Sequence, residues 1–160
     1  MEGHLPAGRF DIGRVIIAGD GPDTSFLGAS DEQALRAPAV SGAFEAVAEI
    51  VEAFEGRVWL VSKCGPRIER RTRLWLDAHR FFAHTGLAAS HLRFCRERRD
   101  KAAIAVDLGL DRFVDDRADV LRAMRGLVPR LILFGAARAE GGMIAAPDWR
   151  RALRAVTEMR

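Results

Sequence analysis

Acidic, hydroxyl and ammonium side chains stand at the ends of short apolar segments of this chain of 160 residues. In order along the chain, they are Asp11, Ser62 with Lys63, Lys101, and the pair Asp115–Asp116. Carboxylates that converge on one place repel one another unless a cation joins them, and Mg²⁺ is the usual such cation beside phosphate. A lysine and a hydroxyl group would hold phosphate oxygens, and an aspartate can act as a nucleophile that forms an aspartyl phosphate. These residue types therefore indicate magnesium-assisted chemistry on a phosphorylated compound.

The hydrophobic pattern predicts elements that would bring these residues together. Short apolar runs predict strands at residues 9–12, 57–61, 92–95, 112–114 and 130–134. Apolar residues spaced three and four apart predict helices at residues 40–54, 66–82, 101–108, 118–125 and 147–159. Strands that alternate with helices predict one Rossmann-like α/β domain over residues 1–160, with a parallel five-stranded sheet and helices on both faces. Ligands bind outside the carboxyl ends of such strands, which is where the polar residues stand.

Four of these segments occur in an order that is specific. They are FDIGRVI at residues 10–16, VWLVSKC at 58–64, Lys101 within RRDKAAIA, and RFVDDRADVL at 112–121. Together they resemble the four motifs of the haloacid dehalogenase (HAD) superfamily, and they span most of the chain. The resemblance implies a HAD-like fold, bound Mg²⁺, and a phosphatase or phosphotransferase that acts through an aspartyl nucleophile.

The resemblance also implies a role for each residue. Asp11 would be the nucleophile and a Mg²⁺ ligand, and Asp115 and Asp116 would hold the metal from the fourth motif. Ser62, Lys63 and Lys101 would bind the phosphoryl group, and Lys101 would also neutralise the nucleophile. Asp119 is an alternative to Asp116, because some members of the superfamily use D-x-x-x-D.

The first motif departs from the pattern of the superfamily at one decisive position. Gly13 stands where a second aspartate acts as general acid and base, and Arg14 stands where glycine usually follows. The backbone carbonyl of Gly13 could still bind the metal, but losing a general acid typically costs about 10²–10⁴-fold in rate. Two hypotheses follow: a weak Mg²⁺-dependent phosphohydrolase, and a catalytically impaired protein that binds or regulates.

A different alignment of the first motif is also open. The segment GDGPDTS at residues 19–25 follows an apolar run and contains Asp20 and Asp23. Its acids are spaced D-x-x-D rather than D-x-D, and Asp11 is followed by the apolar segment typical of the motif. We therefore favour Asp11 as the nucleophile.

The intervals between the motifs predict an open site. Neither the interval from Asp11 to Ser62 nor that from Ser62 to Lys101 is long enough for a full cap domain. Residues 20–38 show little periodicity and predict a long loop or flap, a kind of segment that is usually functional at this length. Members of the superfamily that lack a cap often act on large substrates or close their site by homo-oligomerisation.

Composition limits the partners and the location. The net charge is +3, and the basic residues form no tract with interleaved aromatic residues, so a nucleic-acid partner is not expected. Arg67, soon after Ser62, is a candidate contact for a substrate anion. No apolar stretch is long enough for a membrane helix, and no leader pattern is present, so the expected location is the cytoplasm. The expected partner is a small-molecule or macromolecular phosphorylated substrate.

Overall fold

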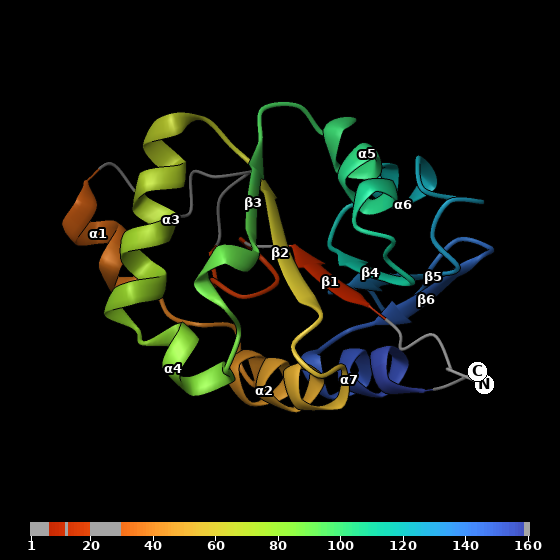
Figure 1. Ribbon diagram of the computed structural model, residues 1–160, viewed down its shortest axis with the longest axis horizontal. Helices are drawn as coiled ribbons and strands as arrows, with labels where there is room; N and C mark the ends of the chain where they lie inside the picture. Colours follow the sequence, from red (N-terminus) through yellow and green to blue (C-terminus); the bar gives the residue numbers. More distant parts are fainter. Residues whose placement is uncertain (1–6, 12, 20–29, 159–160) are drawn as a thin grey trace.

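The computed structural model describes residues 7–11, 13–19 and 30–158 and contains one parallel sheet with six strands. The strands lie in the order β3-β2-β1-β4-β5-β6 (Figure 1). Their bounds are β1 (Gly8–Asp11), β2 (Val58–Lys63), β3 (Leu92–Cys95), β4 (Arg112–Asp115), β5 (Arg130–Phe134) and β6 (Met143–Ala146). The predicted Rossmann-like α/β fold is confirmed, and all five predicted strands are present within two residues of their predicted ends.

The predicted number of five strands is wrong, because β6 extends the sheet beyond β5. β6 pairs with β5 in parallel, with Leu131 opposite Met143 and Phe134 opposite Ala146. The connection at residues 135–142 contains no helix, so the alternation that marks the other strands is missing here. Three of the four residues of β6 are only partly buried, as is common at the edge of a sheet. The sequence of β6, MIAA, is apolar but short, and its two alanines favour a strand only weakly.

Helices cover both faces of the sheet, and alternate strand residues point to each (Figure 1). One face packs against α2 (Ala43–Ala53), α3 (Pro66–Ala78), α4 (Phe81–Thr85) and α7 (Trp149–Thr157). The other packs against α5 (Asp100–Asp107) and α6 (Ala118–Arg122). Val114 and Ile132 belong to the first core, and their neighbours Phe113 and Leu131 belong to the second.

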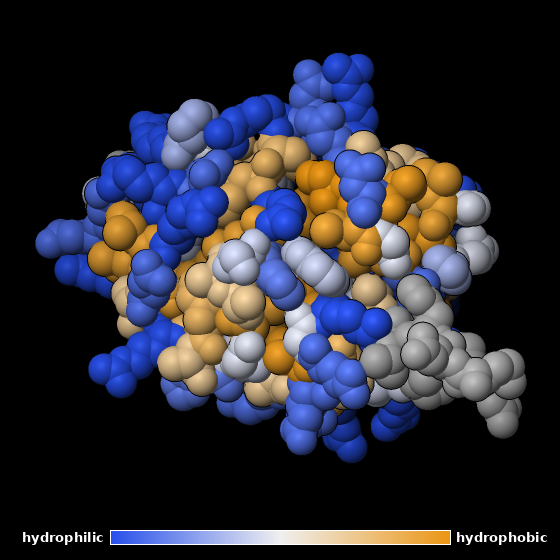
Figure 2. Space-filling view, viewed as in Figure 1, coloured by the Kyte–Doolittle hydropathy of each residue, from blue (hydrophilic) through white to orange (hydrophobic). Residues whose placement is uncertain are grey.

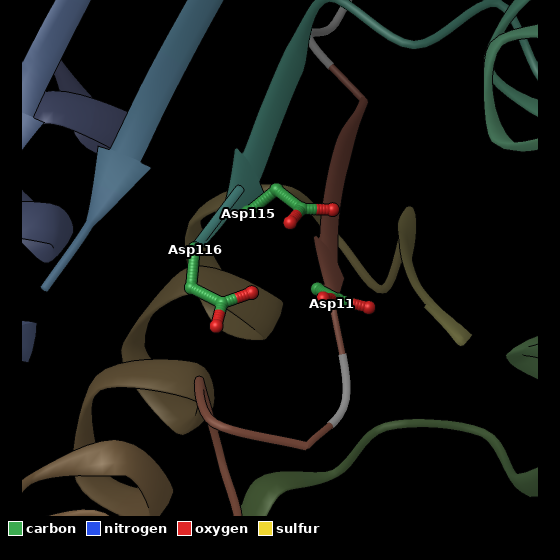
Figure 3. A group of neighbouring side chains, drawn as sticks. All are labelled: Asp11, Asp115 and Asp116. Carbon is green, nitrogen blue, oxygen red and sulfur yellow. The ribbon is translucent and has the colours of Figure 1, made fainter. Parts of the chain in front are cut away.

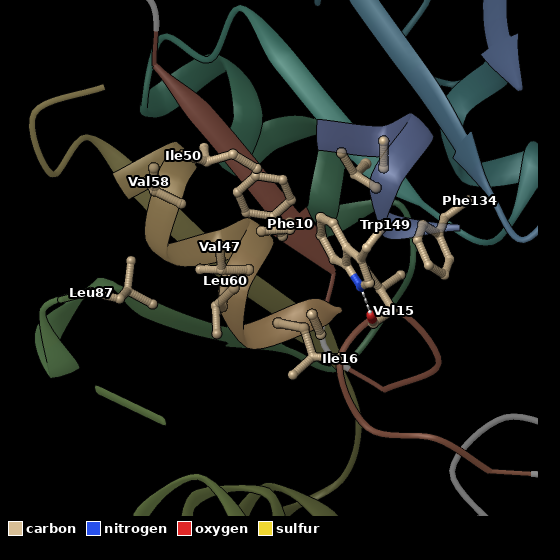
Figure 4. Packing of buried hydrophobic residues seen from close by; sticks show 14 of the residues in the cluster. Phe10, Val15, Ile16, Val47, Ile50, Val58, Leu60, Leu87, Phe134 and Trp149 are labelled. Carbon is tan, nitrogen blue, oxygen red and sulfur yellow. Dashed lines mark hydrogen bonds between the residues drawn. The ribbon is translucent and has the colours of Figure 1, made fainter. Parts of the chain in front are cut away.

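The larger core lies between the sheet and the pair of helices α2 and α7. Val47 and Ile50 of α2 lie near Phe10 of β1 (Figure 4). The ring of Trp149, at the start of α7, lies 5.5 Å from that of Phe10 and 5.2 Å from that of Phe134. The indole nitrogen donates a hydrogen bond to the carbonyl oxygen of Val15, in the loop that follows β1 (Figure 4). The C-terminal helix thereby holds the loop beside the strand end that carries Asp11.

The predicted helix at residues 66–82 is in fact two helices. α3 ends at Ala78 and α4 begins at Phe81, because Arg80 between them has a φ of +54° in the left-handed region. Phe81 and Phe82 on the far side of the break still pack against the core, so the apolar periodicity continues across it. Periodicity alone could not reveal the turn.

The predicted flap is corrected in its second half. Its first part, including Asp20 of the alternative alignment, lies outside the described residues. The later part forms the helix α1 (Asp31–Arg36), which Ser30 caps by accepting a hydrogen bond from the amide of Gln33 at 3.2 Å. Asp31 forms ion pairs with Arg70 and Arg71, so α1 packs on α3. The pattern Ser-x-x-Gln at this capping box is a signal in the sequence that predicts a helix start.

The surface carries both polar and apolar side chains, which are unevenly distributed. Polar residues cover α1 and α3 on the face drawn in Figure 2, whereas apolar side chains gather over α5 and α6. Among residues 7–11, 13–19 and 30–158, the exposed large hydrophobic side chains are Leu74, Val106 and Leu127. No helix in this part of the chain is long and apolar enough to cross a bilayer.

Candidate active site

Three carboxyl groups meet at the carboxyl ends of β1 and β4. These strands are neighbours in the sheet, with Phe10 opposite Val114, so the residues that follow reach the same edge. Asp11, Asp115 and Asp116 each offer an oxygen, and these oxygens lie within 4.8 Å of one another (Figure 3). Asp11 and Asp115 are buried and Asp116 is partly buried. The structure thus brings together the three acids that were expected at these strand ends.

Lys101 supplies the cation that joins two of these carboxylates. It lies in the first turn of α5, and its Nζ donates hydrogen bonds at 2.9 Å to both Asp11 Oδ1 and Asp115 Oδ2. Only 3% of the residue is exposed, and interaction with both acids raises its pKa despite burial. A buried ammonium with two carboxylate partners fixes the direction in which Asp11 faces.

Arg9 is a second buried cation, and the sequence analysis missed it. It is fully buried on β1, and its Nη1 donates a 2.9 Å hydrogen bond to the carbonyl oxygen of Lys101. Its guanidinium lies 3.4 Å above the ring of Phe113. Burial lowers the Arg9 pKa to about 9, which leaves it charged at neutral pH. The sequence feature that could have revealed Arg9 is an arginine inside an apolar strand. It stands two residues before Asp11 and therefore points to the same face of the sheet.

In spite of these cations, the carboxyl groups of the cluster are costly to ionise. Burial, followed by the charge of Asp115, raises the Asp11 pKa to about 8, although Lys101 opposes the shift. Burial and the neighbouring Asp115 also raise the pKa of Asp116. Three carboxyl groups held this close are a donor set for a hard divalent cation, which would lower the cost of their ionisation. The residues present therefore fit a magnesium ion.

A cavity of about 470 Å³ opens beside the carboxylates. Six of the predicted site residues line it: Asp11, Gly13, Ser62, Lys63, Lys101 and Asp116. Asp115 is fully buried behind them. Arg67 does not line the cavity, so the suggestion that it contacts a substrate anion has no support from its position. Arginines from other segments line it instead, namely Arg14, Arg98, Arg117 and Arg122.

The geometry also bears on two alternatives that the sequence left open. Asp119 lines the cavity, but its carboxylate pairs with Arg117 at 3.1 Å and does not belong to the cluster that contains Asp116. Gly13 has a φ of +101°, and its carbonyl oxygen accepts hydrogen bonds from the amides of Ile16 and Ile17 at 3.1 and 2.6 Å. A metal at that carbonyl would compete with both amides, so its use as a ligand stays a prediction.

Solved structures of other proteins share the fold of this chain. The chain has the HAD-like fold that its four motifs predict, since two solved structures of HAD phosphatases and hydrolases match it over nearly its whole length. One is the D,D-heptose 1,7-bisphosphate phosphatase from B. bronchiseptica complexed with magnesium and phosphate, with a TM-score of 0.69, 15% identity, and coverage of 94% of this chain and 97% of that one.

The other matching structure is a haloacid dehalogenase-like family hydrolase from Xanthomonas campestris. Its TM-score is 0.63, with 13% identity and coverage of 96% of each chain. No protein-family model and no curated protein matches the sequence. The structures therefore support a fold shared with hydrolases, and the chemistry of this chain must be argued from its own residues.

Proposed function

We propose that this protein is a Mg²⁺-dependent phosphohydrolase in which Asp11 attacks the phosphorus atom of the substrate. The observation that carries the proposal is the position of Asp11, which lines the cavity while Lys101 holds one of its oxygens. The other oxygen of the carboxylate is left to act as the nucleophile. In our proposal the chain is one domain without a full cap, which would leave the site accessible to a small-molecule or macromolecular phosphorylated substrate.

Each remaining residue has a part in the proposed reaction. Mg²⁺ held by Asp11, Asp115 and Asp116 would offset the charge of the phosphoryl oxygens. Ser62, near the end of β2 beside β1, would donate a hydrogen bond to those oxygens. Lys63, the last residue of β2, would add positive charge for phosphate at the cavity, and Lys101 would keep Asp11 in place. Attack by Asp11 gives an aspartyl phosphate, which water then hydrolyses to inorganic phosphate.

One observation favours the second candidate, a protein that binds phosphorylated ligands without turning them over. Gly13 has no side chain to donate a proton to the leaving group, and its positive φ suits glycine. In that case the carboxylate cluster and the cationic cavity would serve binding or regulation. Homo-oligomerisation and a cytoplasmic location stay predictions under either candidate.

Turnover of p-nitrophenyl phosphate with and without Mg²⁺ tests the proposal, because its leaving group needs little help from an acid. We expect Mg²⁺-dependent release of p-nitrophenol that Asp11→Asn reduces to background. Asp77→Asn, which removes an exposed carboxylate on α3, is the matched control and should turn over normally. Turnover that survives in Asp11→Asn would exclude Asp11 as nucleophile. A native protein that binds Mg²⁺ and phosphate without turnover would instead support the binding protein.

A further inference from the structure

We infer that the substrate is a phosphoanhydride, whose second phosphoryl group is bound by Arg14 and Lys63. This inference rests on the proposed function and names the substrate class of the same site. It joins two observations: cations at the cavity whose side chains form no hydrogen bond or ion pair among the described residues, and the absence of an acid at Gly13, where the leaving group departs.

The cations that line the cavity differ in what they contact. Lys101 is held between Asp11 and Asp115. Arg117 pairs with Asp119 at 3.1 Å, and Arg122 pairs with Glu140 at 2.9 Å. Within the part of the chain that the structure describes, Arg14 and Lys63 form neither a hydrogen bond nor an ion pair through their side chains. Their charges are therefore available to a ligand.

The positions of these two cations fit a ligand larger than one phosphoryl group. Lys63 ends β2, which pairs with β1, and Arg14 follows Asp11 by three residues, so both lie at the edge of the cavity that Asp11 lines. Lys63 and Lys101, the lysines of a chain with 25 lysines and arginines, both line this cavity. Its volume of about 470 Å³ falls in the range of roughly 300–1,000 Å³ that small-molecule sites occupy.

The chemistry of the leaving group selects the anhydride. An alcohol leaves as a strongly basic alkoxide unless an acid protonates it, and Gly13 offers no acid. The leaving group of a phosphoanhydride is itself a phosphate, which is already stable as an anion near pH 7. Positive charges at Arg14 and Lys63 would stabilise the charge that develops on it, so that electrostatic stabilisation replaces proton transfer.

The proposed steps balance without any further reagent. A carboxylate oxygen of Asp11 forms a bond to the terminal phosphorus, and the bond from that phosphorus to the bridging oxygen breaks. The electron pair leaves with the departing phosphate, whose charge Arg14 and Lys63 would offset and which takes any proton it needs from solvent. Water then attacks the phosphorus of the aspartyl phosphate, restores the Asp11 carboxylate, and releases inorganic phosphate with its proton passing to phosphate or solvent.

The test compares three substrates in the presence of Mg²⁺: inorganic pyrophosphate, p-nitrophenyl phosphate and glycerol phosphate. We expect pyrophosphate to have the highest kcat/KM and glycerol phosphate the lowest. Arg14→Gln and Lys63→Gln should each lower the ratio of kcat/KM for pyrophosphate to that for p-nitrophenyl phosphate by about 10–100-fold, the usual effect of losing a charged hydrogen bond. Arg150→Gln removes an exposed arginine on α7 and should leave this ratio unchanged.

The outcomes separate this inference from the proposed function. If Asp11-dependent turnover of p-nitrophenyl phosphate is present but pyrophosphate is no better than glycerol phosphate, the inference is wrong and the proposed function stands. The inference also fails if Arg14→Gln and Lys63→Gln lower both rates equally. If no phosphorylated compound is turned over, both fail.

Discussion

At the scale of single residues, the site is a balance of buried charges. Lys101 and Arg9 are cations inside the fold, and Asp11 and Asp115 are the buried acids nearest to them. Each acid accepts a hydrogen bond from Lys101, yet burial still favours the neutral form of Asp11. Protons and a divalent cation must therefore compete for the same carboxyl group.

This competition predicts how the stabilisation by Mg²⁺ depends on pH. The Asp11 pKa is about 8 in the folded protein and about 4 in an unfolded chain, so the folded state binds more protons between these values. Without metal, this group therefore lowers the free energy of unfolding as pH rises from about 4 to about 8. Because Mg²⁺ binds the ionised form, the melting temperature should rise more on adding Mg²⁺ at about pH 8 than at about pH 5.

Thermal melts of the native protein and of Asp11→Asn at both pH values measure this effect. The asparagine variant cannot ionise at this position, so its response to Mg²⁺ should be smaller and depend less on pH. Equal shifts of the native protein at the two pH values would contradict the assigned coupling between proton and metal.

At the scale of elements, the loop after β1 decides what stands beside the nucleophile. The amides of Ile16 and Ile17 donate to the carbonyl of Gly13, and the amide of Val40 donates to the carbonyl of Ile16 at 2.7 Å. These bonds hold a tight turn directly after Asp11, with Gly13 at a φ of +101°. Because a side chain is strained at this φ, the conformation of the loop itself disfavours an aspartate at position 13.

The obvious restoration, Gly13→Asp, should consequently cost stability as well as add an acid. A residue with a Cβ in the left-handed region is destabilised by about 1–2 kcal/mol, and Gly13→Ala should lose a similar amount in urea denaturation. Turnover of glycerol phosphate then isolates the carboxyl group, since Gly13→Asp should exceed Gly13→Ala if the missing acid limits the rate. An alanine variant as stable as the native protein would show that the turn tolerates side chains.

At the scale of the whole molecule, residues from both ends of the chain build the site. Trp149 of α7 packs against Phe10 and Phe134 and donates a hydrogen bond to Val15, which is 134 residues away in sequence. Trp75 of α3 makes a comparable bond, from its indole nitrogen to the carbonyl of Ala37 at 2.8 Å. Both indoles are buried, and of these two hydrogen bonds the one from Trp149 reaches the loop that follows Asp11.

These two tryptophans form a matched pair for testing long-range support of the site. Trp149→Phe and Trp75→Phe each keep an aromatic ring and leave a buried carbonyl unpaired, so each should lower the free energy of unfolding by about 1–3 kcal/mol. Trp149→Phe should in addition reduce the turnover of p-nitrophenyl phosphate at a temperature where both variants are folded. Equal turnover in the two variants would mean that the bond to Val15 stabilises the fold without supporting the site.

The sequence by itself determined the elements that carry the site. The strands that end at Asp11, Ser62 and Asp115 and the helix that carries Lys101 were predicted, because a run of apolar residues or their spacing specifies a local conformation. Prediction failed at the edge strand β6, where the apolar run is short. It also failed at the turn at Arg80, where the apolar spacing of one helix continues into the next. The start of α1 at Ser30 was available as a capping pattern and was missed.

Only the tertiary structure decided the surroundings of the site residues. It brought Asp116 rather than Asp119 into the carboxylate cluster. It also placed the guanidinium of Arg9 against the carbonyl oxygen of Lys101, and Arg14 and Lys63 at the wall of the cavity. Local pattern specifies where a strand or helix forms, but not which distant side chains share its surroundings. Burial and charge pairing depend on atoms far apart in sequence, and it is burial and charge pairing that set the pKa of Asp11 and the cations open to a ligand.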